Sequence, residues 1–130
     1  MPLYGQKLSQ AVTPCEAGLG RVVAHDKRTP FTGQSALRTR RAAGPRRVLV
    51  GLSSDGRRSP RTGYVIRDPR TATEIGRVTS GMPSPTLGHP VAMAYVSPAY
   101  AVPGTSVAVD VRGRSEPYNV VPLPFYRRQA

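Results

Sequence analysis

Hydrophobic and polar positions alternate along most of the second half of the chain. The clearest alternation runs from Val107 to Val111, where every second residue is valine. Val48, Val50 and Leu52 repeat the same spacing near the middle of the sequence. A period of two residues is typical of β-strands because successive side chains point to opposite faces. The pattern predicts six short strands, at residues 48–52, 63–67, 74–79, 90–96, 107–111 and 118–123.

The segments between these strands carry turn-forming residues. Residues 53–58 and Asp68-Pro69 are typical of turns, and Gly76 indicates a β-bulge within its strand. Residues 80–89 contain two Pro and two Gly, which predicts a ten-residue loop. Residues 90–96 are apolar on both faces and therefore indicate an interior strand. Six short strands separated by turns are typical of a small barrel or sandwich.

The first 45 residues have a different pattern. Residues 33–43 predict a helix, with Thr32 as its N-cap and Gly44-Pro45 ending it. Residues 18–24 predict one short strand that lacks a neighbouring strand, so its edge would be unpaired. We therefore expect residues 1–30 to contact the strand-rich part sparsely.

Charge changes this picture by raising the question of a nucleic-acid partner. The chain has a net charge of +12, from 17 Arg and two Lys against seven acidic residues. A codon bias toward Arg or a missing acidic partner would also explain this excess. Nucleic-acid binding needs the charge on one face, with aromatic side chains beside it for single strands. Only the last of the four Arg pairs has such neighbours, so we expect the pairs to face at least two directions: Arg40/Arg41, Arg46/Arg47, Arg57/Arg58 and Arg127/Arg128.

Candidate chemistry is sparse in this sequence. The single cysteine, Cys15, excludes an intrachain disulfide. His25 and His89 have no Cys or acid at ligand spacing, so no metal site is expected. No stretch approaches the roughly 18 apolar residues of a membrane span, and no signal-peptide pattern opens the chain. We expect a cytoplasmic protein without a membrane partner.

Several motifs do carry a specific resemblance. They follow one another in order over essentially all 130 residues: Met1-Pro-Leu-Tyr-Gly, Thr13-Pro14, Glu16-Ala-Gly-Leu-Gly20, Phe31-Thr-Gly-Gln-Ser-Ala-Leu37, Val78-Thr-Ser-Gly-Met-Pro-Ser-Pro-Thr-Leu-Gly88 and Leu123-Pro-Phe-Tyr-Arg127. Together they resemble the C-terminal part of the glycine cleavage system T proteins, which are aminomethyltransferases.

This resemblance implies a mainly β fold with a defined organisation. Residues 1–30 would be the remnant of an α/β folate-binding domain, and residues 31–45 a linker helix. Residues 46–126 would form a small antiparallel six-stranded β-barrel, followed by a tail over residues 127–130.

The resemblance also implies an activity. T proteins transfer a one-carbon unit from the aminomethyl-lipoyl arm of H protein to tetrahydrofolate and release ammonia. The family's catalytic Asp lies upstream of the matching part, so we expect no catalytic residue in this chain and no activity from it alone. The implied partners are lipoylated H protein and a separately encoded N-terminal half, in a bacterial cytoplasm.

Four residues match positions near the family's folate site. The resemblance implies that Tyr126 faces the folate and that Leu3 and Tyr4 lie near the same cavity. Arg21 stands where the family usually has Trp, and its planar guanidinium could stack on a ring. Two alternatives stay open: a basic β-barrel that binds nucleic acid, and a non-catalytic interaction domain of the same fold.

Overall fold

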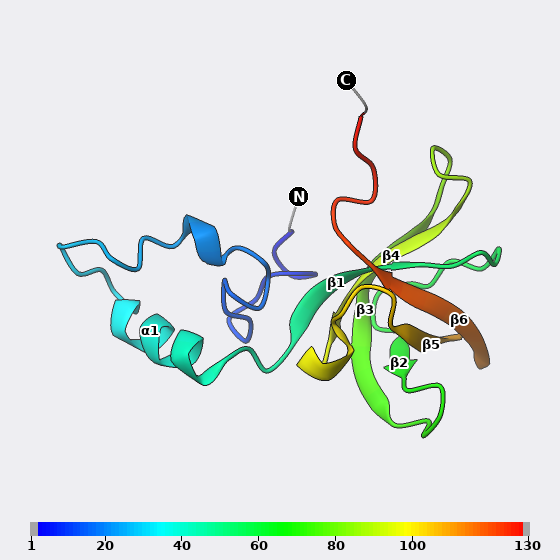
Figure 1. Ribbon diagram of the computed structural model, residues 1–130, viewed down its shortest axis with the longest axis horizontal. Coiled ribbons are helices and arrows are strands. Elements are labelled where there is room, and N and C mark those ends of the chain that lie inside the picture. Colours follow the sequence, from blue (N-terminus) through cyan, green and yellow to red (C-terminus); the bar gives the residue numbers. More distant parts are fainter. Residues whose placement is uncertain (1–2, 129–130) are drawn as a thin grey trace.

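A closed antiparallel barrel forms the main body of the protein. The computed structural model describes residues 3–128, and the barrel order is β1-β4-β3-β2-β5-β6 (Figure 1). The six strands confirm the expected mainly β class: β1 Val48–Ser53, β2 Val65–Arg67, β3 Glu74–Ser84, β4 His89–Val96, β5 Ser106–Val111 and β6 Arg114–Val121. The other elements are the helix α1 Gln34–Ala43 and the 3-10 turns Gly20–Val22 and Pro98–Tyr100. No helix among residues 3–128 is long and apolar enough to cross a membrane.

The alternating residues fill the barrel interior. Val107, Val109 and Val111 are buried, as the period of two predicts, and Leu52 and Ile66 are fully enclosed beside them. These branched aliphatic side chains suit a pleated surface. Their burial is the main stabilising contribution to the barrel. Strand β4 is buried on both faces, because a segment outside the barrel covers the face that the interior does not use.

The prediction of a ten-residue loop at residues 80–89 is wrong. Strand β3 continues to Ser84 and pairs with β4 through to His89, so a tight hairpin replaces the loop. Gly81 and Pro83 suggested a loop because both residues are depleted in strands. Gly81 is needed here for packing instead, since a Cβ at this position would lie 2.5 Å from the carbonyl oxygen of Pro60.

The sixth strand begins four residues earlier than predicted, at Arg114. It forms a hairpin with β5 through Arg112 and Gly113, which both have positive φ, 56° and 78°. This pair of angles is typical of a two-residue hairpin turn. Arginine is uncommon at the first of these two positions, so the turn is not evident from the sequence.

Two predictions about the first 45 residues are also wrong. The expected strand at residues 18–24 is instead the 3-10 turn Gly20–Val22, since no strand lies beside it for pairing. The helix α1 is confirmed, but its N-cap is Gly33, with φ 86°, rather than Thr32. A left-handed N-cap suits glycine because it has no Cβ to clash. Gly44 follows the helix as predicted.

The N-terminal segment packs on the outside of β1 and β4, which contradicts the expected sparse contact. The Tyr95 hydroxyl donates to the Lys7 carbonyl at 2.7 Å, and Lys7 Nζ donates to Ser80 Oγ at 2.9 Å. Farther along, the Leu49 N–H donates to the Glu16 carbonyl at 3.0 Å. The Arg47 guanidinium lies 5.4 Å from the Tyr95 ring centroid. Tyr95 is therefore covered by residues far away in the sequence.

Glu16 anchors this segment through its buried carboxylate. Burial raises the pKa of Glu16, but hydrogen bonds from the Thr13 N–H and hydroxyl, with the nearby Arg47 charge, outweigh it and leave the pKa lowered. The carboxylate therefore stays ionised near neutral pH and keeps the turn at Thr13 closed.

Candidate functional site

An apolar surface lies where the two ends of the chain meet β3 and β4. A hollow of about 250 Å³ is lined there by Ser80, Gly81, Met82, Val91, Ala92, Met93 and Phe125. The C-terminal segment crosses β1 closely, since a Cβ on Gly51 would lie 2.8 Å from the Phe125 ring and 3.0 Å from the Leu123 side chain. Because Gly51 has no side chain, these two apolar side chains can pack directly against β1.

Three of the four predicted site residues are exposed and belong to segments that contact this part of β3. Tyr126 follows Phe125 and is 58% exposed. Leu3 and Tyr4 are 60% and 68% exposed, in a turn that Lys7 holds to Ser80. Because Ser80 also lines the hollow beside Phe125, Lys7 and Phe125 both lie near the same part of β3. Large apolar side chains left this exposed are typical of a surface that another molecule covers.

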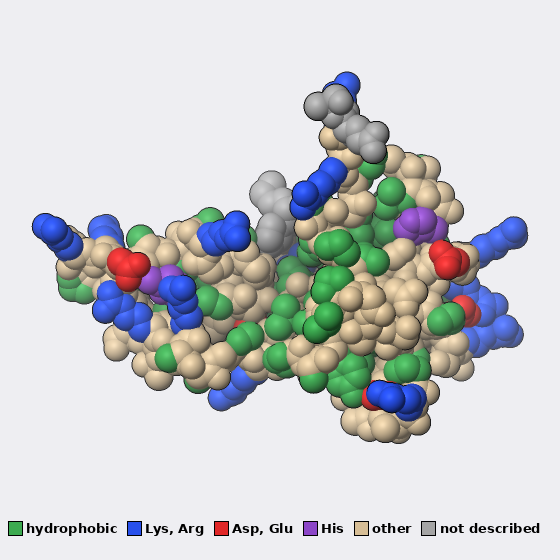
Figure 2. All heavy atoms as spheres, viewed as in Figure 1, with side chains coloured by type: hydrophobic (Ala, Val, Ile, Leu, Met, Phe, Trp, Pro, Cys, Tyr) green, Lys and Arg blue, Asp and Glu red, His purple; other side chains and the backbone are tan. Residues whose placement is uncertain are grey.

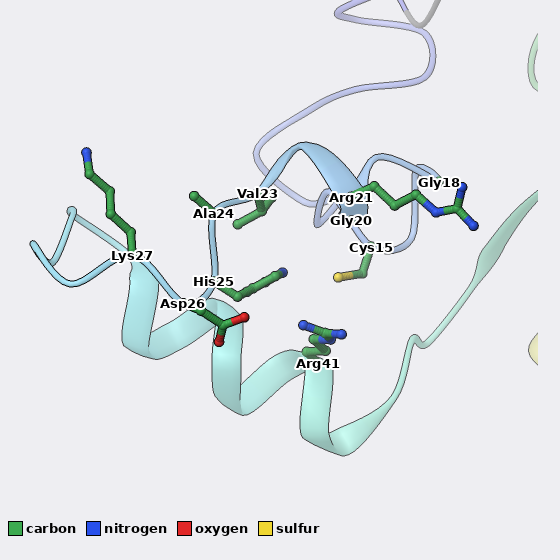
Figure 3. A pocket seen from close by; sticks show the side chains of 10 residues that line it. All are labelled: Cys15, Gly18, Gly20, Arg21, Val23, Ala24, His25, Asp26, Lys27 and Arg41. Carbon is green, nitrogen blue, oxygen red and sulfur yellow. The ribbon is translucent and has the colours of Figure 1, made fainter.

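Arg21 lies in a different hollow. It belongs to the 3-10 turn and lines a cavity of about 660 Å³ between residues 15–27 and α1, together with Cys15, His25 and Arg41 (Figure 3). In this view the Arg21 guanidinium points away from the His25 ring. The structure therefore does not bring Arg21 to the surface that Tyr126 borders.

The walls of the second hollow are held by backbone contacts. The His25 carbonyl accepts hydrogen bonds from Gln34 Nε2 at 3.0 Å and from the Arg38 guanidinium. The His25 ring is buried, and neither ring nitrogen has a partner among residues 3–128. These contacts fasten the loop over residues 25–27 to the first turns of α1.

Asp68 and Tyr100 are ionisable groups of the barrel that are engaged in structural contacts. The Tyr100 hydroxyl donates to Asp68 Oδ2 at 2.6 Å, and the Arg70 N–H donates to Asp68 Oδ1. These hydrogen bonds lower the pKa of Asp68, while the same contact raises the pKa of Tyr100. In the part of the chain that the structure describes, no three His, Cys, Asp or Glu side chains group to hold a metal ion.

Arginine pairs lie at different ends of the molecule. Arg40/Arg41 are on α1, Arg57/Arg58 are in the β1–β2 connection, and Arg127/Arg128 follow the barrel. Figure 2 shows basic side chains at both ends of the long axis. These three pairs therefore lie at separate places on the molecule, as predicted.

Comparison with known proteins identifies this barrel. Residues 47–127 match the glycine cleavage T-protein C-terminal barrel domain. The chain is 59% identical over 133 residues to an aminomethyltransferase of Streptomyces coelicolor, covering 99% of this chain and 35% of that protein. An aminomethyltransferase of Geobacillus kaustophilus is 45% identical over 128 residues, with 98% and 35% covered.

A solved structure shows the same fold. The crystal structure of glycine cleavage system aminomethyltransferase T from Bartonella henselae superposes with a TM-score of 0.89 at 35% identity, covering 97% of this chain and 35% of that one. The fold of this chain thus corresponds to about a third of that larger protein. The chain belongs to the glycine cleavage T-protein C-terminal barrel domain family. It spans about a third of the length of the curated relatives it matches.

Proposed function

We propose that this chain is the barrel module of an aminomethyltransferase. In that reaction a one-carbon unit passes from the aminomethyl-lipoyl arm of H protein to tetrahydrofolate, and ammonia is released. The observation that carries the proposal is the 59% identity to a named aminomethyltransferase over 99% of this chain. The partners would be lipoylated H protein and the folate-binding part of the enzyme, whether in one chain or encoded separately.

The module would close one side of the folate cavity. Tyr126 supports this role because its ring is exposed beside an apolar hollow, where a flat heteroaromatic ligand can stack. Leu3 and Tyr4 would lie at the edge of the same cavity. Arg21 lines a separate hollow beside α1, so we do not assign it to the surface near Tyr126.

The chemical step would belong to the rest of the enzyme. We assign no catalytic residue to this chain, because the hollow beside Phe125 offers apolar contact and the carboxylates of Glu16 and Asp68 are engaged in structural bonds. Its contribution to the rate would be positioning, which holds the folate in reach of the aminomethyl group.

Exchange of segments tests the proposed function. This chain would replace the matching 133-residue segment of the Streptomyces coelicolor aminomethyltransferase, and ammonia release from aminomethylated H protein would be measured with tetrahydrofolate. We expect kcat/KM within about tenfold of the parent, a difference of about 1.4 kcal/mol. The isolated chain is the control and should give no enzymatic release. A folded exchanged enzyme with no tetrahydrofolate-dependent release would refute the proposal.

A further inference from the structure

Five arginines line one groove at the end of the barrel farthest from α1. The groove encloses about 420 Å³, and its lining includes Arg57, Arg58, Arg61, Arg112, Arg114 and Ser59. The first three arginines come from the β1–β2 connection and the other two from the β5–β6 hairpin. Basic side chains extend from this end of the molecule, opposite α1, in Figure 2. The surface near Tyr126 shares none of these residues.

The positive charge of the groove is only partly neutralised. Arg58 forms an ion pair with Glu116, and it is the only one of the five with a salt-bridge partner among residues 3–128. Asp55 lies in the same connection, and the Asp110 carboxylate accepts the Gly113 N–H at 2.8 Å. The five guanidinium cations outnumber the three nearby carboxylates, so the cations repel one another. An anionic ligand would relieve this repulsion.

The backbone at Arg112 is in an unfavourable conformation. Its φ of 56° lies in the left-handed region, where Gly, Asn or Asp is usual at this position of a two-residue hairpin. A left-handed non-glycine residue costs roughly 1–2 kcal/mol. Such strain persists mainly where a side chain is needed at that place.

The arginines of the β1–β2 connection rest on a fixed backbone. The buried Tyr118 hydroxyl donates to the Arg58 carbonyl at 2.5 Å, and Thr62 Oγ1 donates to the Thr79 carbonyl at 2.9 Å. Burial, with the charge of Glu116, raises the pKa of Tyr118 to about 12, so the hydroxyl stays a donor at neutral pH. A ligand that binds here would need little reordering of the main chain.

The shape and lining select the class of ligand. A concave groove of this size suits a small molecule, and its lining holds no aromatic side chain on which a base could stack. Guanidinium groups match phosphate oxygens with two parallel hydrogen bonds. The Ser59 hydroxyl also lines the groove, is shielded from solvent, and has no hydrogen-bond partner among the described residues.

We propose that this groove is a binding site for a small polyanion that carries two or more phosphate groups. The site is separate from the folate surface and does not depend on the proposed function.

Calorimetric titration of the full chain with inorganic triphosphate, pyrophosphate and phosphate tests the site. We expect triphosphate to bind at least tenfold more tightly than phosphate, because several guanidinium groups engage it at once. The double variant Arg57→Gln/Arg112→Gly should weaken triphosphate binding by tenfold or more. Glycine relieves the positive φ at residue 112, so this variant should fold at least as well.

The matched control is Arg40→Gln/Arg41→Gln on α1, which removes the same charge from the other end of the molecule. It should change triphosphate affinity by less than twofold. An equal loss in both double variants would show nonspecific attraction and overturn the site. So would tighter binding of an acidic peptide or of a single-stranded oligonucleotide at the same groove.

Discussion

Replacing Gly76 with alanine should lower the free energy of unfolding by about 3 kcal/mol or more. A Cβ on this residue would lie 2.2 Å from the Tyr95 carbonyl oxygen and 2.9 Å from Val96 Cα. Both atoms belong to the β4 backbone, which cannot move aside without breaking its pairing with β1 and β3. Gly76 also adjoins the bulge where β2 and β3 shift register, as the sequence indicates.

Urea unfolding would measure this effect, with Gly56→Ala as the control. The nearest atom to a Cβ on Gly56 is the Ser54 hydroxyl oxygen at 3.3 Å, and a side chain of this kind can turn away. The control should change stability by less than about 1 kcal/mol. Equal midpoints for the two variants would show that the close approach of β3 to β4 at Gly76 is misplaced.

Deleting residues 1–31 should destabilise the barrel by about 4–6 kcal/mol. The deletion uncovers the Tyr95 ring, whose burial is worth about 1.5–3 kcal/mol, and removes hydrogen bonds worth about 1 kcal/mol each. Those bonds join Lys7 to Tyr95 and Ser80, and Glu16 to Leu49. The sequence pattern alone predicts the opposite, an unchanged barrel.

Thermal unfolding of the full and shortened chains decides between these expectations. Tyr95→Phe in the full chain separates the hydroxyl bond from the packing, and it should cost only about 1 kcal/mol. An unchanged melting temperature after the deletion would show that residues 1–31 are not part of the stable unit. The domain boundary predicted between residues 30 and 31 would then be correct.

Local periodicity predicted the barrel well. Strand β5 is clear in the sequence because Val107, Val109 and Val111 face the barrel interior, whereas the residues between them do not. Interior placement of β4 also followed from its apolar residues on both faces. These signals are local in the sequence, and the formation of strands depends on them directly.

Long-range contacts could not be predicted in the same way. Lys7 and Tyr95 are 88 residues apart, and nothing near either residue indicates their hydrogen bond. The β3–β4 hairpin was missed because Gly81 and Pro83 are strand-depleted residues whose use depends on packing against Pro60. The hydrogen bond and the hairpin both depend on tertiary contacts, which a single sequence does not reveal.

The candidate site shows the same division. Tyr126, Leu3 and Tyr4 are predicted from motifs and stay predictions, and the structure adds that their side chains are exposed. Met82 and Phe125, which line the hollow there, stand in the quoted motifs but were not predicted as site residues. The arginine groove was also hidden, because its members are spread over residues 57–114 and meet only when the barrel closes.

The central claim is that this chain supplies the surface that faces folate. Titration of tetrahydrofolate into the exchanged enzyme, and into its Tyr126→Ala and Tyr126→Phe variants, tests this most directly. We expect the alanine variant to bind about tenfold more weakly or worse, since it loses a stacked ring, whereas the phenylalanine variant keeps most of the affinity. A folded exchanged enzyme whose tetrahydrofolate affinity is the same with tyrosine or alanine at residue 126 would contradict it.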